Sequence, residues 1–189
     1  MKAWLADGWL AGIRHLRSPN QGSRPADAQV SLLLIHNISL PPNVFSGDAV
    51  ERFFTNQLDP AAHPYFSTIA GLQVSAHFLI RRSGRVVQFV ACDQRAWHAG
   101  KSSWNGRDDC NDFSVGIELQ GNDHLPYSKS QYAALWPLID ALRRRYPITA
   151  VAGHCHVAAG RKSDPGEAFD WAAVRRRYPA LCLPPEVAG

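Results

Sequence analysis

The run Leu32-Leu33-Leu34-Ile35, which follows Ser31, constrains the fold most, because it is short, wholly apolar and ends directly at His36. A run of this length without polar alternation is typical of a β-strand that is buried on both faces. Such a strand needs other elements on both sides of its sheet. The sequence therefore predicts a covered sheet, with His36 at the end of one strand.

Further strands follow this run. We expect strands over 73–80, 86–90 and 113–119, and Arg81–Arg85 is typical of a hairpin turn between the first two. Helical segments alternate with these strands. This order indicates an α/β fold, in which a single domain contains a central mixed β-sheet flanked by helices.

Three helices are predicted. Asp48 is expected to cap the first, which carries Val50, Phe53 and Phe54 on one face. The second begins at Ser128, which with Gln131 has the spacing of a capping box, and Pro137 is expected to kink it. The third is expected over about 170–177.

The composition supports one domain over 1–189, with a core over about 8–180, because 46% of the 189 residues are hydrophobic. No apolar run reaches the roughly 18 residues of a membrane-spanning helix. Asp7 and Gly8 interrupt what would be the apolar core of a signal peptide. We therefore expect a cytoplasmic protein with no membrane partner.

The cysteines and the excess of basic residues have ordinary structural interpretations. Much of the formal charge of +4 lies in two Arg-Arg-Arg-Tyr-Pro pieces, 143–147 and 175–179, each at the end of a helix-like segment. We interpret them as solvated helix ends and expect no nucleic-acid partner. The cysteines are too few for a disulfide framework, and we expect buried free thiols at Cys92, Cys110, Cys155 and Cys182.

The segment Gly153–Gly166 concentrates side chains that bind metals. It contains His154, His156, Lys162 and Asp164, and imidazole and carboxylate are ligands that suit zinc. Two ligand sets compete: His154 with His156, or one of these two with His36 and Asp164. Spacing alone does not choose between them, although the second set leaves the open position that a catalytic zinc requires.

Two further titratable residues lie in predicted strands. Glu118 shares a strand face with Gly116 and Gln120, and it is either a solvated carboxylate or the base that a catalytic metal centre needs. His77 lies in an apolar strand, where an imidazole needs a hydrogen-bond partner. It is either structural or a support for the metal site.

Several segments together resemble the AmpD-like zinc amidases, a group related to bacteriophage lysozyme-type amidases and peptidoglycan recognition proteins. The segments are Leu34–Pro42, Arg95–Gly100, Gly116–Leu119, Gly153-His154 and Lys162 with Asp164-Pro165-Gly166. The likeness extends from about Gly8 to Trp171.

This resemblance implies zinc bound by His36, His154 and Asp164, with Glu118 as general base and Lys162 as electrostatic stabiliser. The implied substrate is an anhydro-muropeptide, cleaved between N-acetylmuramic acid, preferably the 1,6-anhydro form, and the L-alanine of the stem peptide. For such enzymes this reaction is linked to cytoplasmic peptidoglycan recycling and to restraint of β-lactamase induction.

Four residues are expected to contact the substrate: Asn37 beside a proposed ligand, and Trp97, His98 and Arg107 in the long loop 91–112. An arginine there would meet a peptide carboxylate bidentately. We expect a monomer. The alternative function is a peptidoglycan-fragment binding module that does not cleave its ligand, and the retained ligands and base favour the enzyme.

Overall fold

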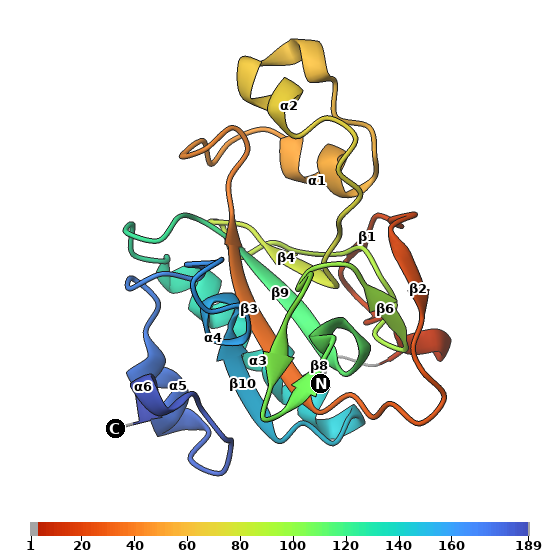
Figure 1. The fold of residues 1–189 in the computed structure, drawn as a ribbon. Coiled ribbons are helices and arrows are strands. Elements are labelled where there is room, and N and C mark those ends of the chain that lie inside the picture. The colour runs from red at the N-terminus through yellow and green to blue at the C-terminus, as the bar shows by residue number, and fades with distance from the viewer. Residues whose placement is uncertain (1–3, 189) are drawn as a thin grey trace.

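The computed structural model describes residues 4–188, and at its centre lies a six-stranded sheet in the order β1-β5-β4-β9-β3-β10 (Figure 1). Strands β4 and β5 pair antiparallel, whereas the other neighbours in this sheet run parallel. The predicted mixed sheet is therefore confirmed. Its strands are β1 (Arg14–His15), β3 (Leu32–Ile38), β4 (Phe78–Ile80), β5 (Val86–Gln88), β9 (Ser114–Gln120) and β10 (Ala150–Gly153).

Short elements and helices surround this sheet. Two small antiparallel pairs join β2 (Gln21–Ser23) to β6 (Gln94–Ala96) and β7 (Ser103–Trp104) to β8 (Arg107–Asp108). The α-helices are α1 (Ala49–Phe54), α2 (Pro64–Thr68), α3 (Lys129–Arg145), α4 (His154–Val157), α5 (Trp171–Arg177) and α6 (Pro185–Ala188). The 3-10 turns are η1 (Ala6–Gly8), η2 (Pro60–Ala62) and η3 (Cys110–Asp112). Helices α1 and α2 stand together at one end of the sheet (Figure 1).

The two faces of β3 lie in different apolar clusters. Leu33 and Ile35 belong to the cluster that includes the buried face of α3. Leu32 and Leu34 belong to a second cluster with Phe113 and other residues of the 99–113 region. Because side chains alternate along a strand, His36 points to the same face as Leu32 and Leu34. The strand is buried on both sides, as its composition predicts.

The predicted strand over 73–80 is shorter than expected, because only Phe78–Ile80 forms β4. The ring of His77 accounts for part of the difference. His77 N–H donates to Gly116 O at 3.1 Å, but the ring Nδ1 of His77, in place of a backbone carbonyl, accepts the hydrogen bond from Gly116 N at 3.0 Å. Its Nε2 lies 3.1 Å from the carbonyl oxygen of Gln94 and 3.1 Å from Nη2 of Arg24. His77 is therefore a satisfied structural histidine.

The predicted helices are present, with one error at a cap. Ser128 Oγ accepts from Gln131 N at 3.1 Å, and Gln131 Oε1 accepts from Ser128 N at 2.9 Å, so the capping box of α3 is confirmed. Helix α3 continues through Pro137 to Arg145. Asp48 precedes α1 but does not cap it with its side chain, because its carboxylate instead accepts from Arg52 Nε at 3.0 Å.

The expectation of four buried free thiols needs one correction. All four cysteines are free, but only Cys92 and Cys110 are buried, whereas Cys155 is half-buried and Cys182 is exposed. The arginine triplets occupy the last turns of α3 and α5, as predicted. Within residues 4–188, no helix has the length and apolar character needed to cross a bilayer.

Candidate active site

Three neighbouring parallel strands bring the site together at one edge of the sheet. β9, β3 and β10 lie side by side, and the carboxyl ends of parallel strands meet at the same edge. The register pairs His36 with Glu118 and Gly153 with Ile35. His154, directly after Gly153, therefore lies beside His36, and their ring centroids are 4.6 Å apart.

Asp164 joins these two histidines from the far end of the loop that follows α4. Its Oδ2 lies 3.0 Å from Nδ1 of His36 and 3.2 Å from Nδ1 of His154. The peptide N–H of Cys155 donates to the Asp164 carbonyl at 2.9 Å, which holds the two ends of the loop together. One ligand atom from each of the three side chains lies within 4.8 Å of the others, so they could hold a metal ion.

The charges of this cluster suit a cation. Burial lowers the pKa of His36, which keeps its ring neutral. Burial alone would raise the pKa of Asp164, but the contacts of its carboxylate with the side chains of His154 and His36 outweigh burial and hold this pKa below its usual value. Two neutral imidazoles and one carboxylate form a donor set with one negative charge.

Glu118 is the least satisfied polar side chain near this cluster. It is only 8% exposed, and its Oε2 has no hydrogen-bond partner among the described residues. Burial raises its pKa well above the usual value, the charge of Asp164 adds to this, and Lys162 opposes it. A buried carboxyl group with a free oxygen and a raised pKa is suited to exchange protons with a bound molecule.

The cluster opens into a cavity of about 420 Å³. Its polar lining includes Glu118, Lys162 and Asn37. Its apolar wall comes largely from α1 and the segment after it, and the aromatic and aliphatic lining residues are Ile38, Leu40, Pro42, Phe53, Phe54, Tyr65, Ile69, Leu72, Val74 and Trp97. A site with one polar end and one apolar wall suits a ligand of mixed character.

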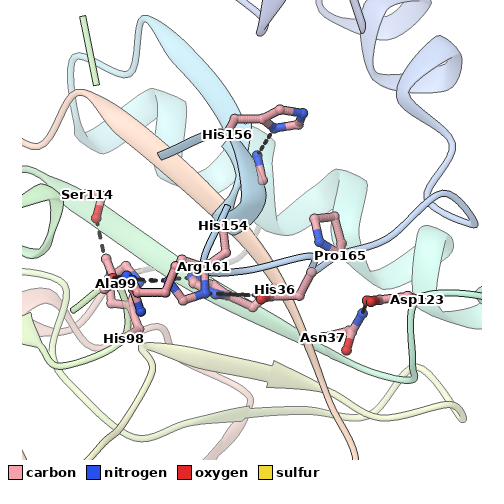
Figure 2. Close-up of polar contacts among 12 residues, drawn as sticks. His36, Asn37, His98, Ala99, Ser114, Asp123, His154, His156, Arg161 and Pro165 are labelled. Atoms are coloured by element: carbon pink, nitrogen blue, oxygen red, sulfur yellow. Dashed lines mark hydrogen bonds and ion pairs between the residues drawn. The ribbon is translucent and has the colours of Figure 1, made fainter. Parts of the chain in front are cut away.

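Three of the four predicted substrate contacts border the cavity, and the fourth, Arg107, does not. Asn37 and Trp97 line the cavity, and Asn37 Nδ2 donates to Asp123 Oδ1 at 2.7 Å (Figure 2). His98 also borders the cavity but is buried, with Nδ1 3.0 Å from Nε2 of His36. Arg107 is not among the lining residues. It is exposed on β8, with its guanidinium 3.9 Å from the centre of the Phe113 ring.

His156 lies outside the cluster. Its Nδ1 accepts from Gly153 N at 2.9 Å (Figure 2). Its ring packs edge-on against Trp171. Of the two ligand sets that the sequence leaves open, the structure assembles His36, His154 and Asp164.

Sequence reasoning missed the apolar wall and the outer support of the site. Tyr65 and Leu72 line the cavity, but they lie in a segment without clear periodicity, so no local pattern in the sequence marks them. Ser114 and Asn111, which contact the histidine-bearing segments, look like ordinary polar residues in the sequence. Their partners are distant in sequence, so no local pattern identifies them.

Comparisons with known proteins identify the family of this chain. The family model described as N-acetylmuramoyl-L-alanine amidase matches residues 26–167. The 1,6-anhydro-N-acetylmuramyl-L-alanine amidase AmpD of Citrobacter freundii is 53% identical over 182 residues, which cover 95% of each chain. AmpD of Haemophilus influenzae is 47% identical over 88% of this chain and 92% of its own.

Solved structures give the same result. A crystal structure of a selenomethionine AmpD derivative superposes with a TM-score of 0.89 at 53% identity and covers 92% of this chain and 98% of its own. The Drosophila peptidoglycan recognition protein SD, at 20% identity and a TM-score of 0.59, covers 88% of this chain and 90% of its own, and shares the fold. The chain therefore belongs to the N-acetylmuramoyl-L-alanine amidase family and is an enzyme of that family.

Proposed function

We propose that this amidase uses zinc to hydrolyse the amide between N-acetylmuramic acid, preferably in the 1,6-anhydro form, and the L-alanine of the stem peptide. The observation that carries the proposal is the convergence of His36, His154 and Asp164 beside the unpartnered oxygen of Glu118. A ligand set with a base next to it is what metal-assisted hydrolysis needs.

The donor set fits zinc. Bonds of about 2 Å in a tetrahedral site separate neighbouring ligand atoms by about 3.3 Å. Asp164 Oδ2 lies 3.0 Å and 3.2 Å from the two imidazole nitrogens, which is close to that separation. Three protein ligands also leave a position for water or substrate. When bound there, zinc supplies Lewis-acid chemistry that favours attack by water near neutral pH.

Glu118 and Lys162 have separate roles in this reaction. Glu118 accepts a proton from the attacking water through its free carboxylate oxygen, and then delivers a proton to the departing alanine amine. Lys162 lines the same cavity, and its ammonium stabilises the negative charge that develops on the carbonyl oxygen of the substrate. Glu118 thus transfers the protons, and Lys162 stabilises the negative charge on the substrate.

The cavity supports a muropeptide as substrate. Asn37 offers a polar contact and Trp97 an apolar one, and both line the cavity. Two solved relatives contain related ligands. One is AmiD of Escherichia coli, 26% identical, in complex with anhydro-N-acetylmuramic acid-L-Ala-D-gamma-Glu-L-Lys, and the other is AmpDh3 of Pseudomonas aeruginosa, 30% identical, in complex with an anhydromuramic pentapeptide. Each superposes with this chain over about two thirds of its own length, 65% in both cases.

The cellular role proposed with this activity is cytoplasmic peptidoglycan recycling, with restraint of β-lactamase induction, by a monomer that binds neither nucleic acid nor membranes. Its support is the match to AmpD enzymes over nearly the full length of both chains, for example 95% of each chain for the Citrobacter freundii enzyme.

The substrate is tested directly with defined muropeptides. The zinc-loaded protein is expected to release free stem peptide from an anhydro-muramyl peptide faster than from the same peptide on a reducing-end muramyl group. Mass spectrometry measures both products. Equal rates would contradict the anhydro preference, and binding without release would identify a non-catalytic binding module.

The ligand set is tested by zinc content. Asp164→Ala is expected to lose bound zinc, because it removes the only carboxylate of the cluster. His156→Asn is the matched control, since an amide oxygen can accept from Gly153 N as the His156 ring does. This control is expected to retain one zinc per chain by elemental analysis. The reverse result would indicate a site formed by His154 and His156.

Glu118 and Lys162 are expected to affect turnover without affecting metal content. Glu118→Gln should retain zinc and lose at least about 100-fold in rate, because it removes the base. Lys162→Ala should retain zinc and lose about 100- to 1000-fold. Lys129→Ala, at an exposed position on α3 outside the cavity, is the control. Near wild-type turnover of Glu118→Gln would exclude its role as base.

The raised pKa of Glu118 predicts the sign of a stability effect. In the metal-free protein the folded state binds the Glu118 proton more tightly than the unfolded state does, so its contribution is fully present at acid pH and is lost as pH rises through the folded-state pKa. Glu118→Gln should therefore match the wild type near pH 4 and exceed it above the raised pKa. Urea unfolding at several pH values measures this difference. A constant difference across pH would show that the pKa of Glu118 is not raised.

A further inference from the structure

One short segment, His98-Ala99, contacts both histidines of the cluster on the side away from Asp164. The carbonyl oxygen of Ala99 lies 3.0 Å from Nε2 of His154, and Nδ1 of His98 lies 3.0 Å from Nε2 of His36. In both ligand histidines the other nitrogen, Nδ1, faces Asp164. A nitrogen can bind a metal only when it carries no proton, so the partner of Nε2 decides whether Nδ1 is available.

For His154 the answer follows from a single contact. A backbone carbonyl oxygen can only accept a hydrogen bond. Nε2 of His154 therefore carries the proton and donates it to Ala99 O. This leaves the lone pair of Nδ1 directed at the metal position beside Asp164.

For His36 the position of the proton depends on two further side chains, Ser114 and His98. Ser114 Oγ lies 2.5 Å from the carbonyl oxygen of Cys110, which cannot donate, so the Ser114 hydroxyl is the donor. Ser114 Oγ then accepts from Nε2–H of His98 at 3.3 Å. With its proton on Nε2, His98 presents a bare Nδ1 and accepts from Nε2–H of His36 (Figure 2). Nδ1 of His36 is left without a proton.

The packing around His98 prevents its ring from leaving this arrangement. The side chain is 8% exposed, and a Cβ on Gly116 would lie 2.6 Å from its ring atoms, so only glycine leaves room for it. Asn111 Oδ1 accepts from the backbone N–H groups of His98 and Ala99 at 3.0 Å and 2.8 Å. The backbone and the ring are both held.

We propose that His98 is a positioning residue of the metal site, which fixes the proton of His36 on Nε2 through a chain of hydrogen bonds that ends at Ser114 and the Cys110 carbonyl. The proposal rests on the proposed zinc site at His36, His154 and Asp164. It gives the 98–111 region a role in preparing the metal ligands, in place of the direct substrate contact expected for His98.

The test compares two substitutions of equal shape. In His98→Asn the amide oxygen stands near the position of Nδ1 and can accept from His36, whereas His98→Leu has the same branched skeleton without an acceptor. We expect His98→Leu to bind zinc about 10- to 100-fold more weakly than His98→Asn, as measured by competition with a chromophoric chelator. Ser114→Ala should weaken zinc binding in the same direction. Equal affinities in the two His98 variants would show that the ring only fills space and would overturn the proposal.

The proton positions are measured independently in the wild-type protein. Two-dimensional ¹⁵N spectra of the imidazoles are expected to show the proton of His98 on Nε2, both without metal and with zinc. A proton on Nδ1 of His98 would overturn the proposal even if every variant were unfolded. Failure of the wild type to bind zinc would instead contradict the proposed metal site, and the tautomer of His98 in the metal-free protein would still decide its role.

Discussion

In-register parallel pairing of β3 with β9 sets His36 opposite Glu118, and the geometry of the site depends on this pairing. A shift of one residue would turn either side chain to the opposite face of the sheet, toward α3. The apolar residues on the other face prevent such a shift, because Leu33, Ile35 and Ile117 are fully buried against that helix. The core therefore positions the edge of the sheet that carries the candidate active site, as well as stabilising the fold.

The site contains a buried polar group whose burial lowers the stability of the folded protein. Glu118 has a buried oxygen without a partner, and such a group typically destabilises a folded protein by about 1–3 kcal/mol. The surrounding strands tolerate this because they are held by apolar packing on both faces. A carboxyl group that the protein leaves unsatisfied is available to a water molecule or a substrate in the cavity.

Segment 91–112 contributes to two parts of the candidate site. Trp97 lines the cavity, whereas the next two residues, His98 and Ala99, contact His36 and His154. Arg161 Nη2 also donates to the Ala99 carbonyl at 2.9 Å, so the loop that carries Asp164 is tied to the same segment. The wall of the cavity and the contacts to His36 and His154 therefore share one short piece of backbone.

Local patterns were sufficient for much of the fold. The apolar run before His36, the hairpin at 81–85 and the capping box at Ser128 each identified an element, because period, turn chemistry and capping are properties of neighbouring residues. The strand at 73–80 was overestimated, since the ring of His77 replaces a backbone partner that no local pattern reveals. The cap expected of Asp48 failed for a similar reason, as Arg52 competes for its carboxylate.

For the site, the sequence by itself determined the kinds of ligand available and, through the family resemblance, a specific set of residues. Spacing alone did not decide between His156 and His36 as partner of His154, because both spacings permit a metal site. The tertiary structure decided this, since parallel strands bring residues 36 and 154 to one edge, while His156 turns back to accept from Gly153 N. The tertiary structure also places Arg107 outside the cavity and His98 in contact with His36. These positions depend on contacts between residues that lie far apart in the chain, so the sequence does not reveal them.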